Sequence, residues 1–172
     1  MSAFFIYKCS NRPFNFVESL FNYTDEYCQR NTNCLVDISK ITPFKWDTLY
    51  VIDSGWSRSE IEALIGTDFT EKMDHFSKLI FVKNGQVVYS DEYYYLSDFA
   101  GHVGSKKILT LNFEYENQKK GLIAYYHISK DNPKILIYTE YHPAVSDKTN
   151  YLFSPSNESQ VQRLSEKFRT PS

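Results

Sequence analysis

The sequence predicts an α+β domain in which an antiparallel sheet of about five to six strands packs against helices. Fourteen tyrosines and thirteen phenylalanines stand among 172 residues, and aromatic side chains suit the pleated, half-buried surface of a sheet. Strand-like runs also follow one another across short polar turns, which makes an antiparallel meander the simplest topology. The helices are expected at the N-terminus, in the middle and at the C-terminus.

The N-terminal stretch is typical of a strand followed by a helix. Met1–Cys9 is too short for the core of a signal peptide and is interrupted at Lys8. Asn11 and Pro13 suit a helix start, because Asn caps free amides and Pro is tolerated in the first turn. The helix should run to about Arg30. Apolar residues at three- and four-residue steps then form its core-facing stripe: Phe16, Val17, Leu20, Phe21, Tyr27 and Cys28.

The next elements are two strands and a short helix. Cys34–Ile38 and Trp46–Asp53 have the apolar and β-branched content of strands. Ser57 and Glu60 have the spacing of a capping box, so a helix should begin there and end at Gly66.

The second half of the chain predicts a hairpin and further strands. Asn84–Gly85 supplies the two positive-φ residues of a tight turn between Lys78–Lys83 and Gln86–Tyr89, which places Phe81 opposite Val88. Three strands linked by polar turns complete the meander: Ile108–Glu116, Leu122–Ser129 and Ile135–Tyr141. After a polar stretch, apolar residues at helical spacing predict the C-terminal helix: Val161, Leu164 and Phe168.

Composition limits the class of protein. Hydrophobic residues at 42% and charged residues at 23% are typical of a globular chain. No run approaches the roughly eighteen apolar residues of a membrane-spanning helix. We therefore expect one domain over residues 1–172, cytoplasmic and without membrane contact. The formal net charge of −2 does not suit a protein that neutralises phosphate backbones, so direct nucleic-acid binding is not expected.

The spacing of cysteines and histidines predicts neither a metal site nor a disulfide. Cys9, Cys28 and Cys34 are odd in number and lack the spacing of a disulfide framework, which indicates reduced thiols. None of the four histidines stands three to five residues from another His or Cys: His75, His102, His127 and His142. We expect no metal and no cofactor.

Other candidates for chemistry have plainer interpretations. The stretch 101–107 contains two glycines, a serine and lysines, but the following run alternates like a strand, whereas a phosphate loop opens a helix. No nucleophile elbow surrounds Ser105 or Cys34. No catalytic residue is predicted. A small hydrolase that uses His102 or His127 beside carboxylates is kept as an alternative.

The segment Tyr89–Asp98 is the main candidate for contact with a partner. Tyrosine supplies large, stiff contact area, and carboxylates complement a basic partner. The predicted partner-binding residues include two glutamates of the following strand: Asp91, Glu92, Tyr93, Tyr95, Asp98, Glu114 and Glu116. The plainer interpretation is an edge strand with tyrosines on both faces.

Lysines gather at the predicted strand ends: Lys106, Lys107, Lys119, Lys120, Lys130 and Lys134. Lysine at such positions commonly protects sheet edges. Nucleic-acid binding through these lysines, with tyrosines stacking on bases, is a second alternative function.

The segment Thr42–Ile52 resembles a motif of small bacterial proteins, Phe-x-Trp-Asp-x-Leu-Tyr before a capped helix. The matching positions are Phe44, Trp46, Asp47, Leu49 and Tyr50. The resemblance departs at Ser54–Gly55, where a Pro-Tyr pair is expected. The helix and hairpin that follow are also similar to modules of the β-lactamase-inhibitor-protein type, which implies a binding fold. Trp46 and Asp47 have two interpretations, a structural role or contact with a partner.

Small, slightly acidic proteins of this kind include immunity proteins of contact-dependent growth inhibition systems. The resemblance implies that a preformed acidic surface occludes the active site of a toxin domain, often a basic nuclease. The predicted function is therefore an immunity or inhibitor protein rather than an enzyme, and the predicted partner is a protein toxin domain.

Overall fold

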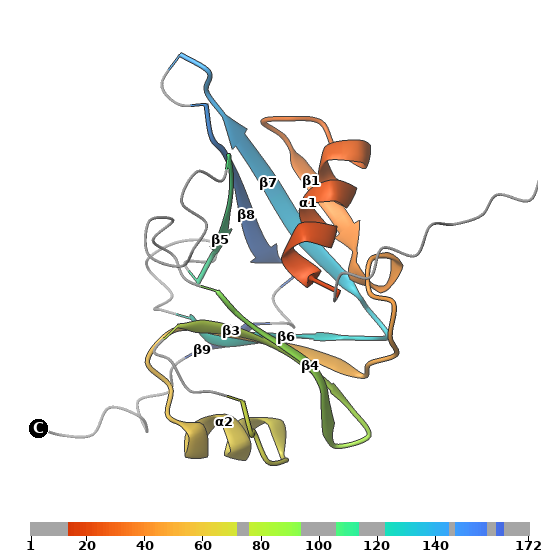
Figure 1. Cartoon of the computed structure of the whole chain (residues 1–172), viewed down its shortest axis with the longest axis vertical. Helices are drawn as coiled ribbons and strands as arrows, with labels where there is room; N and C mark the ends of the chain where they lie inside the picture. The colour runs from red at the N-terminus through yellow and green to blue at the C-terminus, as the bar shows by residue number, and fades with distance from the viewer. Residues whose placement is uncertain are drawn as a thin grey trace, which may run out of the picture.

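The computed structural model describes residues 14–71, 76–93, 106–113, 123–144, 147–157 and 161–163. Within these ranges the chain is an α+β protein with strands in two sheets (Figure 1). The helices are α1 (Phe16–Tyr27), α2 (Arg58–Ile65) and a short 3-10 helix (Ile38–Lys40). The strands are β1 (Asn33–Asp37), β2 (Thr48–Ile52), β3 (Ser77–Lys83), β4 (Gln86–Tyr93), β5 (Lys107–Leu111), β6 (Ile123–Ser129), β7 (Lys134–Tyr141), β8 (Thr149–Pro155) and β9 (Val161–Arg163).

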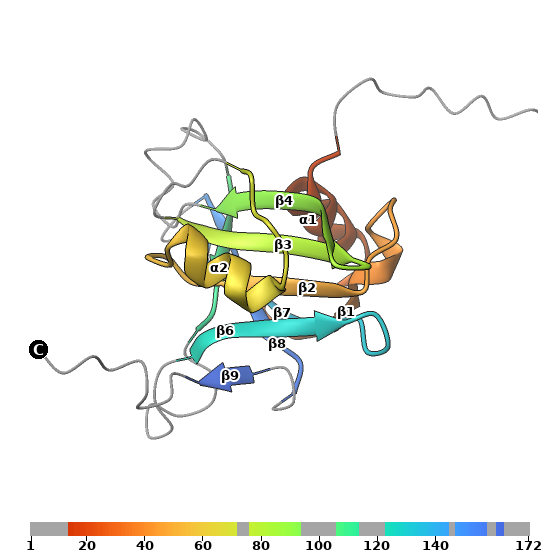
Figure 2. The same ribbon diagram turned by 90° about the horizontal axis from the view of Figure 1, so that it is seen from below.

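The two sheets form separate layers. Sheet A has the strand order β1-β7-β8-β5, and sheet B has the order β4-β3-β2-β6-β9. Neighbouring strands are antiparallel except β5 and β8, which are parallel. Sheet B lies between α2 on one side and sheet A with α1 on the other, as Figures 1 and 2 show.

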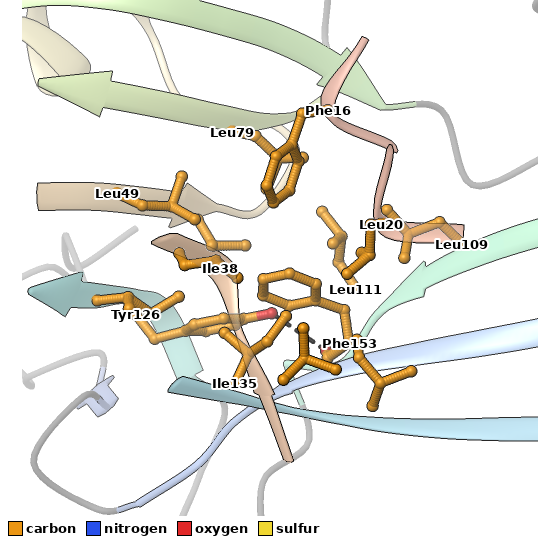
Figure 3. Packing of buried hydrophobic residues seen from close by; sticks show 14 of the residues in the cluster. Phe16, Leu20, Ile38, Leu49, Leu79, Leu109, Leu111, Tyr126, Ile135 and Phe153 are labelled. Carbon is orange, nitrogen blue, oxygen red and sulfur yellow. Dashed lines mark hydrogen bonds between the residues drawn. The ribbon is translucent and has the colours of Figure 1, made fainter. Parts of the chain in front are cut away.

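The main core fills the space between the two sheets and α1. Phe16 and Leu20 of α1 meet residues of both sheets there, among them Leu79 and Phe153 (Figure 3). The hydroxyl of Tyr126 donates a hydrogen bond of 3.2 Å to the carbonyl of Phe153 and so joins β6 to β8. A second, smaller core lies under α2 on the other face of sheet B: Ile52, Ile61, Ile65, Phe69, Ile80 and Val82.

Helix α1 is shorter than the sequence predicts. Its cap is Asn15, whose side chain accepts the amide of Glu18 at 2.7 Å, while Asn11 lies outside the described residues. The buried face is Phe16, Leu20 and Thr24. The prediction that Tyr27 belongs to the core stripe is wrong. Tyr27 is the last helical residue, its side chain is 64% exposed, and its ring packs against that of another tyrosine on the same helix.

The capping box and the hairpin turn are confirmed, with one change of register. Ser57 and Glu60 bond each other's backbone amides, and Gly66 ends α2 with a φ of 71°. Asn84 and Gly85 have φ values of 50° and 70°. A bulge after the turn places Phe81 opposite Tyr89 and not opposite the predicted Val88, which becomes the extra residue.

The prediction of a single antiparallel meander is wrong. The polar turn after Ser129 is not a hairpin turn but a corner, since β6 pairs with β2 and β9 in sheet B while β7 pairs with β1 and β8 in sheet A. A short polar link has the same composition in both cases, so the sequence does not distinguish them.

Two segments near the C-terminus also differ from the prediction. The predicted polar stretch contains β8, an inner strand of sheet A whose Tyr151 and Phe153 are buried. Val161–Arg163 is β9 and not the start of a helix, because its backbone pairs with β6. Leu164 and Phe168, like the predicted first strand Met1–Cys9, lie outside the described residues.

The expectation of reduced thiols is wrong for two of the three cysteines. Cys28 and Cys34 form a disulfide with a Cα–Cα distance of 5.8 Å. The reversal between α1 and β1, which includes Asn31 at a φ of 58°, brings them together. Cys9 lies outside the described residues.

Candidate functional site

The predicted acidic, tyrosine-rich strand corresponds to β4, and its two described carboxylates contact the chain itself. Glu92 Oε1 lies 2.7 Å from Nζ of Lys78, which is only 2% exposed. Asp91 Oδ2 accepts a hydrogen bond of 3.2 Å from the Tyr89 hydroxyl. These two acids therefore serve to hold the fold together. Tyr93 is the last residue of β4, and the other predicted contact residues lie outside the described ranges: Tyr95, Asp98, Glu114 and Glu116.

The described histidines are not brought together. His127, on β6, has its ring centroid 6.5 Å from that of Tyr50. His142 Nε2 lies 3.6 Å from Glu140 Oε1, and both side chains are exposed. His75 and His102 lie outside the described residues. In the part of the chain that is described, no group of three or more His, Cys, Asp or Glu residues is arranged to hold a metal ion.

The strand register places apolar side chains on the face of sheet A that points away from the core. Leu35 pairs with Leu136, and Tyr138 pairs with Leu152. Paired residues project from the same face of a sheet, so these four side chains form two adjacent rows. Ile108 of β5 projects from this face as well, since its partner Asn150 lies beside these rows. We call these five residues the outer face of sheet A: Leu35, Ile108, Leu136, Tyr138 and Leu152.

The outer face of sheet A is accessible. Leu35 is 55% exposed, and the other four residues are half-buried. None of the five belongs to either core cluster, while α1 and α2 contribute their apolar residues to those clusters. Polar pairs border the apolar rows: Asp37 with Lys134, and Glu140 with Asn150. An apolar centre with a polar border is the usual anatomy of a protein-binding surface.

A second accessible feature is an open hollow of about 660 Å³. It lies where the segment before β2, the β3–β4 turn and the end of β6 meet. We call it the lysine hollow, and its lining is Ser39, Thr42, Pro43, Phe44, Lys45, Trp46, Asp47, Lys83, Asn84 and Lys130. Neither His127 nor His142 is among these residues.

Asp47 links the three segments of the lysine hollow. Its Oδ1 lies 2.7 Å from Lys130 Nζ, and its Oδ2 accepts the backbone amide of Asn84 at 2.8 Å. Both hydrogen bonds lower the pKa of the Asp47 carboxyl below its ordinary value, and the one from Lys130 has the larger effect. The hydrogen bond to Asp47 also raises the pKa of the Lys130 amine. The amide that Asp47 binds is thus remote in sequence.

Of the two interpretations of Trp46, the structure supports the structural role. Its side chain is 6% exposed in the main core, and its Nε1 donates a hydrogen bond of 3.0 Å to Thr42 Oγ1. The motif that carries the resemblance therefore builds one wall of the lysine hollow. Sequence reasoning missed this hollow, because its lysines come from three segments that are far apart in the chain.

Comparison with protein-family models, with curated proteins and with solved structures finds no match to this chain. The two described α-helices, of 12 and 8 residues, are too short to cross a bilayer.

Proposed function

We propose that this protein acts by binding another protein, and that it is an inhibitor of the immunity type whose partner is a bacterial toxin domain. The observation that supports protein binding is the outer face of sheet A. Contiguous apolar side chains on the surface of a folded chain mark sites of macromolecular contact. The toxin as partner rests on the resemblance of this small, slightly acidic chain to immunity proteins of contact-dependent growth inhibition systems.

The outer face of sheet A suits an inhibitor for a physical reason. Its side chains stand on paired strands joined to the main core, so their positions are set before a partner arrives. A surface ordered in advance loses little conformational entropy on binding. In this proposal the apolar centre provides the contact, and the partner's active site is closed by occlusion.

The acidic strand β4 is a second candidate surface. Asp91 and Glu92 are held by Tyr89 and Lys78, so their carboxylates would have to contact a partner while keeping these bonds. For this reason we place the main contact on sheet A.

Growth rescue is the direct test. The product of the gene immediately upstream would be expressed as the candidate toxin in a sensitive bacterium, with and without this chain. We expect the full chain to restore growth and to form a stoichiometric complex with the toxin domain. Failure of the wild-type chain both to bind the toxin domain and to restore growth would contradict the proposed function.

Matched variants locate the surface. Leu35→Gln with Tyr138→Gln removes apolar area from the outer face of sheet A, and we expect it to weaken the complex by about tenfold or more. Tyr27→Gln with Val88→Gln removes exposed apolar side chains elsewhere and should leave binding unchanged. Asp91→Asn tests the acidic strand. Loss of binding in an Asp91→Asn variant that unfolds at the wild-type temperature, with binding kept in Leu35→Gln with Tyr138→Gln, would assign the contact to β4 and reject sheet A.

A further inference from the structure

The lysine hollow carries surplus positive charge on a chain whose formal net charge is −2. Its lining includes three lysines and one carboxylate. Both oxygens of that carboxylate, Asp47, already accept a hydrogen bond, one from Lys130 and one from the Asn84 amide. Two positive charges are therefore left without compensation in the lining.

Lys45 and Lys83 supply this surplus. Within the described residues neither side chain forms an ion pair. Lys83 is nevertheless near enough to Asp47 to help lower the pKa of its carboxyl. Positive charges that line one hollow repel one another, and an anion bound among them reduces this repulsion. The hollow thus favours a negatively charged ligand.

The frame of the hollow is ordered in advance. The Asp47 amide donates to the carbonyl of Val82 at 2.8 Å, and the Lys130 amide donates to the carbonyl of Asp47 at 2.9 Å. Phe44 is packed on one side by the rings of Phe81 and Tyr89. These contacts hold the segment before β2, the β3–β4 turn and the end of β6 together, so ligand binding requires little further ordering of the backbone.

We propose that the lysine hollow binds a phosphate group of a small phosphorylated molecule through Lys45, Lys83 and Lys130. A phosphate monoester carries close to two negative charges at neutral pH, which matches the two surplus positive charges. Lysine binds phosphate as a mobile point charge and needs no fixed planar geometry. The volume of about 660 Å³ lies within the range of small-molecule sites. This proposal is independent of the proposed inhibitor function.

The test is a titration of the full-length chain followed by amide and indole chemical shifts. Pyrophosphate is the first probe and adenosine diphosphate the second, each compared with sodium chloride at the same ionic strength. We expect saturable shifts at the Asn84 amide and the Trp46 indole with both probes and none with chloride. Tighter binding of the nucleotide than of pyrophosphate would show that the hollow also holds the organic part of the ligand.

Charge-neutral variants connect the binding to the lysines. Lys45→Gln with Lys83→Gln should weaken pyrophosphate binding by about tenfold. Lys106→Gln with Lys148→Gln removes the same charge elsewhere and should leave the affinity unchanged. Shifts that do not saturate, shifts that chloride reproduces, or equal weakening in both double variants would overturn the proposal.

The Asp47→Asn variant should change the affinity for pyrophosphate in the opposite direction. The substitution releases Lys130 and removes a negative charge from the hollow, so we expect pyrophosphate to bind more tightly than to the wild-type chain. Thermal unfolding of the variant shows whether the fold is kept. Weaker binding in a variant that unfolds at the wild-type temperature would contradict the assignment of phosphate to this hollow.

Discussion

Two tyrosine hydroxyls connect helix α1 to the sheets. Tyr89 accepts the backbone amide of Phe16 at 3.1 Å and donates to Asp91. Tyr151 donates to Asp25 Oδ1 at 2.5 Å, and the same carboxylate pairs with a lysine of β5. Burial is the first cause of a raised pKa in both phenols, and it brings the pKa of Tyr89 to about 12. Each hydroxyl thus stabilises the fold in its protonated form.

The Tyr89→Phe variant tests this contact. It leaves the Phe16 amide without its acceptor, and we expect the free energy of unfolding at neutral pH to fall by about 1 to 2 kcal/mol. Because the pKa of Tyr89 is raised in the folded state, its contribution is complete below the ordinary tyrosine pKa of 10.0 and is lost as pH rises toward about 12.

Urea unfolding of wild type and Tyr89→Phe at neutral and alkaline pH measures this contribution. The difference between the two proteins should shrink as pH rises. Tyr138→Phe, on the outer face of sheet A, is the control and should change stability by only a few tenths of a kcal/mol. A difference that stays constant up to pH 11 would argue against the protonated hydroxyl as the source.

At the scale of elements, the disulfide joins the end of α1 to β1. Cys28 is the residue that caps α1, and Cys34 is the second residue of β1. The bond holds an edge strand of sheet A, the strand that also carries Leu35 of the outer face. Disulfides persist in oxidising compartments, whereas the cytosol keeps thiols reduced. The Cys28–Cys34 disulfide is therefore at odds with the expected cytoplasmic location.

The Cys28→Ser, Cys34→Ser double variant measures what the disulfide contributes. Closing a loop whose ends are six residues apart should stabilise the fold by about 2 kcal/mol. Added reductant should destabilise the wild-type chain by this amount and leave the double variant unchanged. Cys9→Ser is the control and should keep the sensitivity to reductant. A reductant effect that disappears in Cys9→Ser would assign the pairing differently.

At the scale of the whole molecule, one core connects the two sheets. Ile137 of sheet A and Leu79 of sheet B are both completely buried in the same cluster, with α1 residues between the sheets. Because neither sheet can lose this contact without exposing the other, the predicted single domain should unfold as one cooperative unit.

Two core truncations test the cooperativity. Ile137→Ala and Leu79→Ala should each lower the free energy of unfolding by about 2 to 5 kcal/mol. In both variants the transition followed by tryptophan fluorescence should coincide with that followed by far-ultraviolet circular dichroism. Two separated transitions, one sensitive to each substitution, would show that the sheets unfold independently and that the chain is not one domain.

The amino-acid sequence by itself determined the features that depend on a few neighbouring residues. The capping box at Ser57 and Glu60 and the turn at Asn84–Gly85 were predictable, because their hydrogen bonds and φ values are set within one turn of chain. The strands at 123–129 and 134–141 were also predicted nearly in place.

Only the tertiary structure decided which strands pair and what their pairing exposes. Whether the turn after Ser129 closes a hairpin or turns a corner depends on the partners that β6 and β7 find elsewhere in the chain. The same long-range pairing brings Leu35 beside Leu136 and Lys130 to Asp47. Contacts between residues far apart in sequence leave no local pattern, because their free energy is gained only when the whole core forms.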